Sequence, residues 1–272
     1  MIINHNLTAA NTLNKMNKHE KATASATQKL SSGLRINNAA DDASGMAISQ
    51  KMKSQIRGLQ QAEHNIQDGI SLLQTADGGL EQIENPLLQR MRELAIQAAN
   101  STLSKEDRQS IQTEIEQIKQ GINDLANNTN FNGIPLLNLP AKNINLQVGA
   151  GSGDTIKIEL TDARTTTLGI DAVKVDPIEE AEKAIANIDL AFEKVLNERT
   201  KYGSYQNGLE HVLNNVANMV FHLTAANSRI EDADMAFESM ELAKNNILFQ
   251  ASGAILAQAN SQPNSVLQLL KQ

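Results

Sequence analysis

Apolar residues recur every three or four positions over long stretches of this chain, and this spacing strongly limits the folds available to it. The clearest repeat steps by four and three residues in alternation through Ile111, Ile115, Ile118, Ile122 and Leu125. A second repeat keeps heptad steps through Ile178, Ile185, Ile188, Phe192 and Val195. Such repeats place one apolar stripe on a helix, and that stripe packs against another helix. The chain is therefore predicted to be mainly α-helical.

The composition suits narrow seams between helices better than a compact enzyme core. Aromatic residues make up 3% of the 272 residues, and there is no Trp. Large rings usually supply much of the buried area of a globular enzyme. The formal net charge of -7 disfavours nucleic acid as a partner, because phosphate binding needs clustered Lys and Arg. The nearest basic run, Lys51, Lys53 and Arg57, is interrupted at helical spacing and indicates a solvated helix face.

Several classes of site and targeting segment are absent from the sequence. The chain has no Cys, which excludes disulfides and thiolate metal sites. No apolar run approaches the roughly 20 residues of a membrane-spanning helix, so no membrane insertion is expected. The segment Met1–His19 is rich in Asn and lacks the apolar core of a signal peptide. Export, if it occurs, would need a dedicated exporter.

The N-terminal region is predicted to contain helices separated by a short link. The first helix runs from about Leu7 to Leu30, and residues 34–40 form the link. Asp41 and Asp42 then stand where an N-cap belongs. A long helical pattern from Ala43 to about Asn100 follows, interrupted by Gly78-Gly79 and by Pro86. Its apolar positions include Ile48, Met52, Ile56, Leu59, Ile66, Ile70, Leu73, Leu80, Ile83 and Leu87.

Local signals mark the boundaries of the other elements. Ser104 and Asp107 have the spacing of a capping box at the start of a helix. In the middle region two alternating runs flank a Gly-rich link, which predicts a β-hairpin; the runs are Ile144, Leu146, Val148 and Ile156, Ile158, Leu160. Asp176 and Pro177 have the order of a cap and a first-turn proline. The helix that follows is expected to continue past Leu223, and a last helix covers about Met235–Ala259.

No catalytic, cofactor-binding or metal-binding motif is present. The five histidines are His5, His19, His64, His211 and His222, and no two have metal-ligand spacing on one helix face. The Gly-rich stretch 149–153 lacks the Gly-Lys-Ser/Thr ending of a phosphate loop. Acidic pairs such as Asp41 and Asp42 stand at helix starts, where capping explains them. The chain is therefore predicted not to be an enzyme and to need no cofactor.

Several segments resemble the signatures of bacterial flagellin. In the N-terminal half these are residues 3–6, 30–37, 39–43, 47–49, 89–97, and 131–133 with 136–137. In the C-terminal half they are residues 223–226, 228–230, 232–236, 245–248 and 256–260. The resemblance covers nearly the whole chain.

The resemblance implies an architecture of long antiparallel helices in coiled-coil layers, with a small β-hairpin and no large outer domain. An inner layer would comprise residues 1–40 and 230–272. A rod-like second layer would comprise residues 41–126 and 176–229, with a short variable region at 127–175. Within the inner layer, the residues expected to pack are Leu7, Leu13, Leu30, Ile247, Leu248, Ile255, Leu256, Val266, Leu267, Leu269 and Leu270.

The resemblance also implies a function, partners and a location. Flagellins polymerise into the helical filament of the flagellum, which serves swimming motility, and they leave the cell through the flagellar export channel. The implied partners are other copies of the chain, an export chaperone on residues 230–272, the filament cap and the hook-filament junction proteins. In some flagellins the stretch matching residues 89–97 lies in a subunit interface and is read by an innate immune receptor. The corresponding positions here are Gln89, Arg90, Arg92, Glu93, Leu94, Ile96 and Gln97, with Arg90, Leu94 and Gln97 expected to make the main contacts.

Some positions depart from the flagellin pattern, and three other functions remain open. Pro86 falls inside a predicted helix, and Gly208 and Gly253 replace larger side chains. The alternatives are a hook-filament junction protein, a flagellin with a catalytic insertion, and a coiled-coil adhesin unrelated to flagella. A catalytic insertion would have to lie within residues 127–175, which contain no His.

Overall fold

The structure is a computed structural model that describes residues 6–138 and 143–269, with side chains through residue 262. It divides into two compact units, which we describe one at a time. The terminal unit combines Met1–Ile56 with Phe221–Gln272, and the central unit is Arg57–Val220. Both are built mainly from long helices, so the predicted mainly α-helical fold is confirmed.

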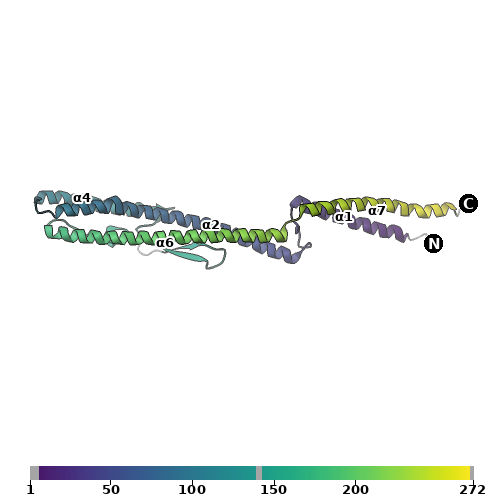
Figure 1. Ribbon diagram of the computed structural model, residues 1–272, viewed down its shortest axis with the longest axis horizontal. Helices are drawn as coiled ribbons and strands as arrows, with labels where there is room; N and C mark the ends of the chain where they lie inside the picture. Colours follow the sequence, from purple (N-terminus) through teal and green to yellow (C-terminus); the bar gives the residue numbers. More distant parts are fainter. Residues whose placement is uncertain (1–5, 139–142, 270–272) are drawn as a thin grey trace. The chain divides into compact units, whose positions relative to one another are not determined.

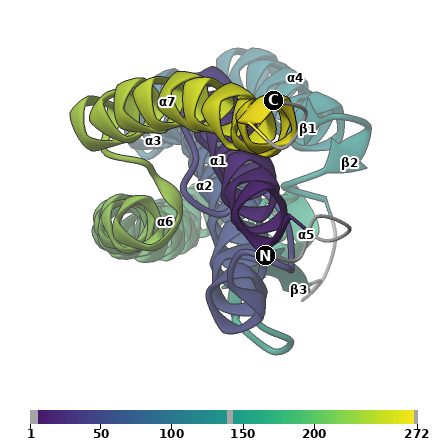
Figure 2. The ribbon, with the colours of Figure 1, turned by 90° about the vertical axis from the view of Figure 1, so that its right-hand side faces the viewer.

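Two helices from opposite ends of the chain pair in the terminal unit. Helices α1 (Leu7–Ser32) and α7 (Met235–Leu269) lie side by side and antiparallel (Figures 1 and 2). The Asn6 side chain caps α1 by accepting a hydrogen bond from the Ala9 N–H at 3.0 Å. Gly33 ends the helix in the left-handed region, at φ 71°, where a glycine avoids the strain of a Cβ. These signals explain why the predicted bounds of α1 hold to within two residues.

Only one of the two predicted capping aspartates caps helix α2 (Ala43–Gln82). The Asp42 carboxylate accepts hydrogen bonds from the Gly45 N–H and the Ser44 hydroxyl, at 2.9 and 2.8 Å. These bonds lower the pKa of Asp42. Asp41 instead accepts the backbone N–H groups of Asn37 and Asn38, each at 3.0 Å. Asp41 therefore fixes the loop before the helix.

The long helical pattern breaks at Pro86 but not at the glycine pair. Gly78 and Gly79 lie inside α2, so the predicted interruption there is wrong. The break is the irregular π-helical segment η1 (Ile83–Leu88), in which Asn85 has φ -135° and ψ 103° and the Asn85–Pro86 peptide is cis. After the break, Leu88 is fully buried and Leu87 is only half-buried. The apolar stripe has therefore shifted by one residue from the predicted Leu87.

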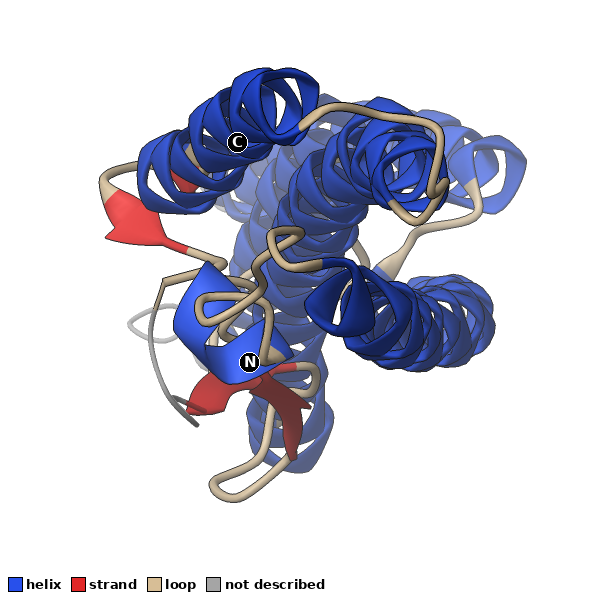
Figure 3. Ribbon diagram, turned by 90° about the vertical axis from the view of Figure 1, so that its left-hand side faces the viewer, coloured by secondary structure: helices blue, strands red, loops and turns tan. Residues whose placement is uncertain are grey.

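Helices α3, α4 and α6 complete the framework of the central unit. Helix α3 (Gln89–Ala98) follows η1, and α4 (Lys105–Asn128) starts with the predicted capping box, in which Ser104 and Asp107 exchange hydrogen bonds of 3.1 and 3.2 Å. Four residues of the predicted α4 seam are buried: Ile111, Ile115, Ile118 and Ile122. Figure 3 shows these helices with the strands to one side.

The buried stripe of helix α6 (Ile178–Glu231) differs from the predicted one. Between residues 178 and 195 its buried residues are Ala181, Ala184, Ile188, Ala191 and Val195, of which Ile188 and Val195 were predicted. Tyr202, Leu209, Val216 and Glu231 are buried further along the helix. Ile178, Ile185 and Phe192 are only half-buried, because small alanines occupy the centre of the seam. Pro177 precedes the first helical residue, and Asp176 lies 3.7 Å from the Arg108 Nε atom.

The described residues in the middle of the chain form two antiparallel strand pairs and one short helix. Strands β1 (Asn130–Phe131) and β2 (Ile134–Pro135) form a small pair, and helix α5 covers Thr165–Leu168. The predicted hairpin is confirmed as β3 (Asn143–Gln147) and β4 (Thr155–Glu159), with Ile144 opposite Ile158 and Leu146 opposite Ile156.

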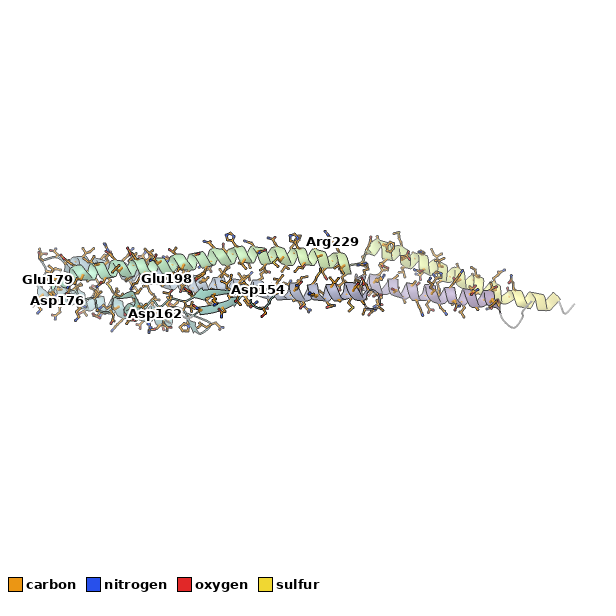
Figure 4. The ribbon with its side chains drawn as sticks, turned by 90° about the horizontal axis from the view of Figure 1, so that it is seen from below. Asp154, Asp162, Asp176, Glu179, Glu198 and Arg229 are labelled. Atoms are coloured by element: carbon orange, nitrogen blue, oxygen red, sulfur yellow. The ribbon has the colours of Figure 1, made fainter. Side chains whose placement is uncertain are left out.

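The β3–β4 hairpin has a fixed turn and rests on helix α2. The Asp154 carboxylate accepts the Gly151 N–H at 2.9 Å. Figure 4 labels Asp154 beside the hairpin. The Asn65 amide of α2 donates to the Gln147 carbonyl at 3.2 Å. The hairpin is therefore held by a helix from a distant part of the sequence.

The glycine pair in α2 offers a matched test of this packing. A Cβ at Gly79 would lie 2.7 Å from Leu137 Cδ1 and 2.9 Å from Thr129 Cγ2, whereas Gly78 faces open space. Gly78→Ala should stabilise the protein by up to about 1 kcal/mol through helix propensity. Gly79→Ala should be less stable than Gly78→Ala by about 1–3 kcal/mol, because it overpacks a buried contact. Chemical denaturation of both variants measures this difference, and equal stabilities would contradict the packing described.

Candidate assembly surfaces

Helices α1 and α7 meet along a seam that is unusually polar. The seam residues are buried or half-buried and step by three and four positions in alternation. On α1 they are Ala9, Thr12, Met16, His19, Thr23, Ala26 and Leu30. On α7 they are Glu238, Leu242, Asn245, Phe249, Ser252, Leu256 and Ala259. The most buried of these are all polar or small: Thr12, Ala26, Glu238, Asn245, Ser252 and Ala259.

Hydrogen bonds cross the seam at three levels. The Asn6 amide donates to the Ala259 carbonyl at 2.8 Å. His19 Nδ1 and Asn245 Oδ1 lie 3.3 Å apart. The Lys29 ammonium donates to the Glu238 carboxylate at 3.0 Å. Several polar groups are thus paired across the seam, which reduces the cost of their burial. Thr12 instead donates to the Thr8 carbonyl of its own helix, and the buried Thr23 hydroxyl has no partner.

Most of the large apolar side chains described on α1 and α7 lie outside the seam, in solvent. On α7, the exposed fractions of Phe237, Met240, Ile247 and Ile255 are 54, 64, 66 and 55%. Among the other predicted packing residues, Leu7, Leu13 and Leu248 are exposed, and Leu30 and Leu256 are half-buried. The side chains of Val266, Leu267, Leu269 and Leu270 lie outside the described residues. A single chain therefore leaves these apolar stripes uncovered.

A carboxylate near the end of α6 joins three segments of the terminal unit. Glu231 accepts hydrogen bonds from Ser49 at 2.7 Å and Asn227 at 3.1 Å, and it also pairs with Lys53. The Glu231 carbonyl accepts the Arg35 N–H at 2.6 Å. Glu231 thus ties α6 to the start of α2 and to the link after α1.

The electrostatics of Glu231 favour its ionised form. Burial by itself raises the pKa of this carboxyl, since the charged form is poorly solvated. The hydrogen bonds from Lys53, Ser49 and Asn227 outweigh that effect and lower the pKa below its ordinary value.

A shallow groove of about 590 Å³ lies between helices α3 and α6 of the central unit. It is lined by Gln89, Arg92, Glu93, Ile96, Asp189, Phe192, Glu193 and Leu196. The Arg92 Nε atom donates to Asp189 at 2.7 Å across the groove. Ile96 and Leu196 are 48 and 43% exposed. The groove therefore combines apolar contact area with charged residues on both walls, as protein interfaces do.

The terminal and central helices match two known sequence families. Residues 3–140 match the family described as the bacterial flagellin N-terminal helical region, and residues 185–270 match the bacterial flagellin C-terminal helical region.

This chain belongs to the bacterial flagellin family.

Full-length relatives agree with this assignment. The flagellin of Halalkalibacterium halodurans is 47% identical over 273 residues, and that of Bacillus subtilis is 44% identical over 305 residues, with all of each chain covered. The crystal structure of Bacillus cereus flagellin is 39% identical, covers 56% of this chain and 88% of the other, and superposes with a TM-score of 0.51. The protein is a structural subunit of the flagellar filament that self-polymerises. The identity to flagellins over the full length argues against the junction-protein and adhesin alternatives.

The predicted recognition stretch of this flagellin is divided between surface and core. Six residues are exposed and available for contact: Gln89, Arg90, Arg92, Glu93, Ile96 and Gln97. Arg90 is held by Glu93 and Glu114 at 3.2 and 2.9 Å. Leu94 is only 1% exposed, so its expected role as a direct contact is wrong in this fold. Its helical phase points it into the core, where it supports the exposed residues beside it.

The part of the chain that the structure describes also bears on metal sites and membrane-spanning helices. No group of three His, Asp or Glu side chains in the described ranges is arranged to hold a metal ion. Among the described helices, none is long and apolar enough to cross a bilayer. His64, His211 and His222 are exposed, and His19 belongs to the α1–α7 seam.

Sequence reasoning missed three parts of these surfaces. It did not identify the α6 wall of the groove, formed by Asp189, Phe192 and Leu196; Phe192 was assigned to the core instead. It missed Glu231, whose partners Ser49 and Lys53 are far away in the sequence. It also missed Arg199, whose guanidinium bonds Asp77 and Glu84 at 2.8 and 2.7 Å on either side of the start of η1. Helical periodicity gives the exposed side of one helix but not which helix stands beside it.

The role of Glu231 predicts a pH-dependent contribution to stability. Glu231→Gln should cost about 1–3 kcal/mol near pH 7, because it removes the charge that Lys53, Ser49 and Asn227 are arranged around. The folded-state pKa lies below the unfolded value of about 4.3, so this stability is complete above that value and is lost as the pH falls through the folded-state pKa. Thermal unfolding from pH 7 down to about pH 3 should show the two proteins converging. Glu93→Gln, at an exposed pair, should follow the wild type throughout.

The buried position of Leu94 predicts different outcomes for two neighbouring truncations. Leu94→Ala should destabilise the fold by about 2–5 kcal/mol, because it leaves a cavity in the core. Ile96→Ala, at a side chain 48% exposed, should change stability by less than about 1 kcal/mol. Denaturant titration of both variants tests this. Equally small losses of stability in both variants would contradict the burial of Leu94 in the core.

Proposed function

We propose that this flagellin polymerises chiefly by covering the exposed apolar stripe of α7 with helices of neighbouring copies. The observation that carries the proposal is the exposure of Phe237, Met240, Ile247 and Ile255 on a helix whose most buried residues are polar or small. Exposed apolar stripes of this kind mark interaction surfaces. A second copy is the proposed occupant, because the family forms homopolymers and every copy presents the same stripe.

Burial of apolar surface should hold the terminal helices together weakly in the free subunit and strongly in the polymer. Burying one large apolar side chain contributes about 1.5–3 kcal/mol. In a single chain these side chains contribute little, because they stay in solvent. Once several are covered, their sum can exceed the cost of association and of ordering the helices. We infer that the terminal helices are marginally stable in the free subunit and become fully ordered on assembly.

We propose a layered arrangement in the polymer. Residues 1–40 and 230–272 form the inner layer, with polar Asn and Gln side chains toward a central channel. Residues 41–126 and 176–229 form the rod-like second layer, with 127–175 as the hairpin and variable region. The length and family identity of the helices support this division.

The α3–α6 groove is proposed as a second contact between subunits. Arg90, Arg92, Glu93 and Ile96 present charge and apolar area on one helix, next to a groove that could receive part of a neighbour. The same surface is proposed as the recognition site of a host innate immune receptor, since its exposed residues match the stretch read in some flagellins.

Further partners and the location are proposed by analogy with the flagellin family. We propose that an export chaperone covers residues 230–272 before secretion, shielding the apolar stripe of α7. The filament cap and the hook-filament junction proteins are proposed to contact the ends of the polymer, which lies outside the cell and drives swimming. The role is proposed to be purely structural, without catalysis or cofactor.

The stripe of α7 provides the test of this assembly mechanism. The double variant Ile247→Gln, Ile255→Gln should keep the thermal unfolding profile of the subunit, because both side chains are already solvated. It should raise the critical concentration for seeded polymerisation by about tenfold or more for each residue covered. Sedimentation and electron microscopy with wild-type seeds measure this. Lys157→Gln, at an exposed position on β4, is the control and should polymerise normally.

Two results would count against this assignment. Long filaments at the wild-type critical concentration from the double variant would show that the stripe is not an interface. A wild-type protein that stays monomeric at high concentration with seeds present would refute polymerisation itself.

A further inference from the structure

The apolar residues of the α1–α7 seam do not select one alignment of the two helices. On α7 they are Leu242, Phe249 and Leu256, and on α1 they include Met16 and Leu30. Members of each set are separated by seven or fourteen residues. Sliding α7 by one heptad therefore places apolar residues opposite apolar residues again. The free energy gained by packing these apolar residues is therefore similar in the observed alignment and in the alignment shifted by one heptad.

The polar residues of the seam distinguish these alignments. In the observed alignment His19 meets Asn245 and Lys29 meets Glu238, at 3.3 and 3.0 Å. A shift of one heptad would bring Asn245 opposite Thr12 or Ala26, and Lys29 would lose Glu238. The Glu238 and Asn245 residues are each 8% exposed, so water could not replace the lost partners well. A buried polar group without a partner is strongly unfavourable.

Assembly of a homopolymer offers each subunit many opportunities to pair α1 and α7 in a shifted alignment. In the proposed polymer each α1 would meet the α7 helices of other copies as well as its own, and each α7 carries a second, more apolar stripe on its outer side. Hydrophobic contact alone would favour the outer stripe and would tolerate shifted alignments. A polar residue at a seam position of a coiled coil is a known means of fixing alignment at some cost in stability.

We propose that the pairs His19–Asn245 and Lys29–Glu238 are the specificity determinants that fix the alignment of α1 on α7 during assembly. This inference rests on the proposed function, since it concerns how the same helices pair in the polymer. Both pairs are satisfied in the observed alignment and are lost in a shifted one. Backbone bonds from Arg35 to Glu231 and from Ala233 to Gly33 hold the same alignment only at the end of α1 and the start of α7. The apolar residues supply stability but not the choice.

The absence of cysteine allows a direct measurement of the alignment. Spin labels are attached to a double variant, Lys18→Cys and Gln250→Cys, in which both positions are exposed. Pulsed electron paramagnetic resonance then measures the distance between the label on α1 and the label on α7. Labelled subunits are diluted into unlabelled ones so that distances within one subunit dominate. The labelled parent should show one distance. His19→Leu, Asn245→Leu should add a population in which α7 has moved by one heptad, about 10 Å along the axis.

The control removes apolar contacts from the same seam. Leu242→Ala, Leu256→Ala should weaken the polymer but keep the single distance of the parent. A single, unchanged distance in His19→Leu, Asn245→Leu would overturn the proposal. A parent that forms no polymer would instead refute the proposed function.

If the variant with both leucines fails to assemble, exchanging the charges of Lys29 and Glu238 tests the proposal independently. Lys29→Glu and Glu238→Lys should each raise the critical concentration by about tenfold or more, because each places like charges at a partly buried contact. Combined, they restore the pair and should return the critical concentration to within about twofold of the wild type. Failure of the double variant to recover would overturn the proposal.

Discussion

The most buried residues of the seam between α1 and α7 are polar or small, and several large apolar residues of α7 remain in water. In an isolated pair of helices this arrangement is unfavourable, because hydrophobic burial is the main source of stability. Ile247 illustrates the point: it lies two residues from the buried Asn245, yet 66% of its surface is exposed. The arrangement is reasonable only for a protein whose native environment includes more copies of itself. The terminal unit is therefore best regarded as an incomplete core.

The central unit differs in the same physical respect. Its core includes fully buried apolar residues from several helices, such as Ile66, Leu80, Met91, Ile115 and Ile188. The hairpin and the loop after α4 pack against α2 at Gly69 and Gly79, where a side chain would leave no room. This unit satisfies its own apolar surface and leaves a limited contact area in the α3–α6 groove. One chain thus combines a unit that is complete by itself with another that depends on neighbours.

The sequence predicted most elements of the fold because their signals are local. Gly33, Asp42 and the Ser104–Asp107 box fix helix ends through nearby backbone groups, and the alternating residues of β3 and β4 define the hairpin. The errors have equally physical causes. Gly78 and Gly79 suggested a break, but helix packing overrode their low propensity. Pro86 was recognised as a break, but the shift of the apolar stripe from Leu87 to Leu88 depends on the irregular backbone at Asn85.

The candidate surfaces were harder to predict, because they depend on contacts between distant segments. Ile247, Leu248 and Ile255 were expected to pack in the inner layer, and their exposure in a single chain is visible only once the seam with α1 is known. Leu94 is the opposite case: it was expected to be a surface contact, like its neighbours in residues 89–97, but its side chain is buried in the core. Both outcomes follow from one rule of helix geometry. Whether a side chain faces the partner helix or solvent depends on its angular position around its own helix relative to that partner. Where the buried seam is polar, the usual inference that apolar residues mark the buried face of a helix fails.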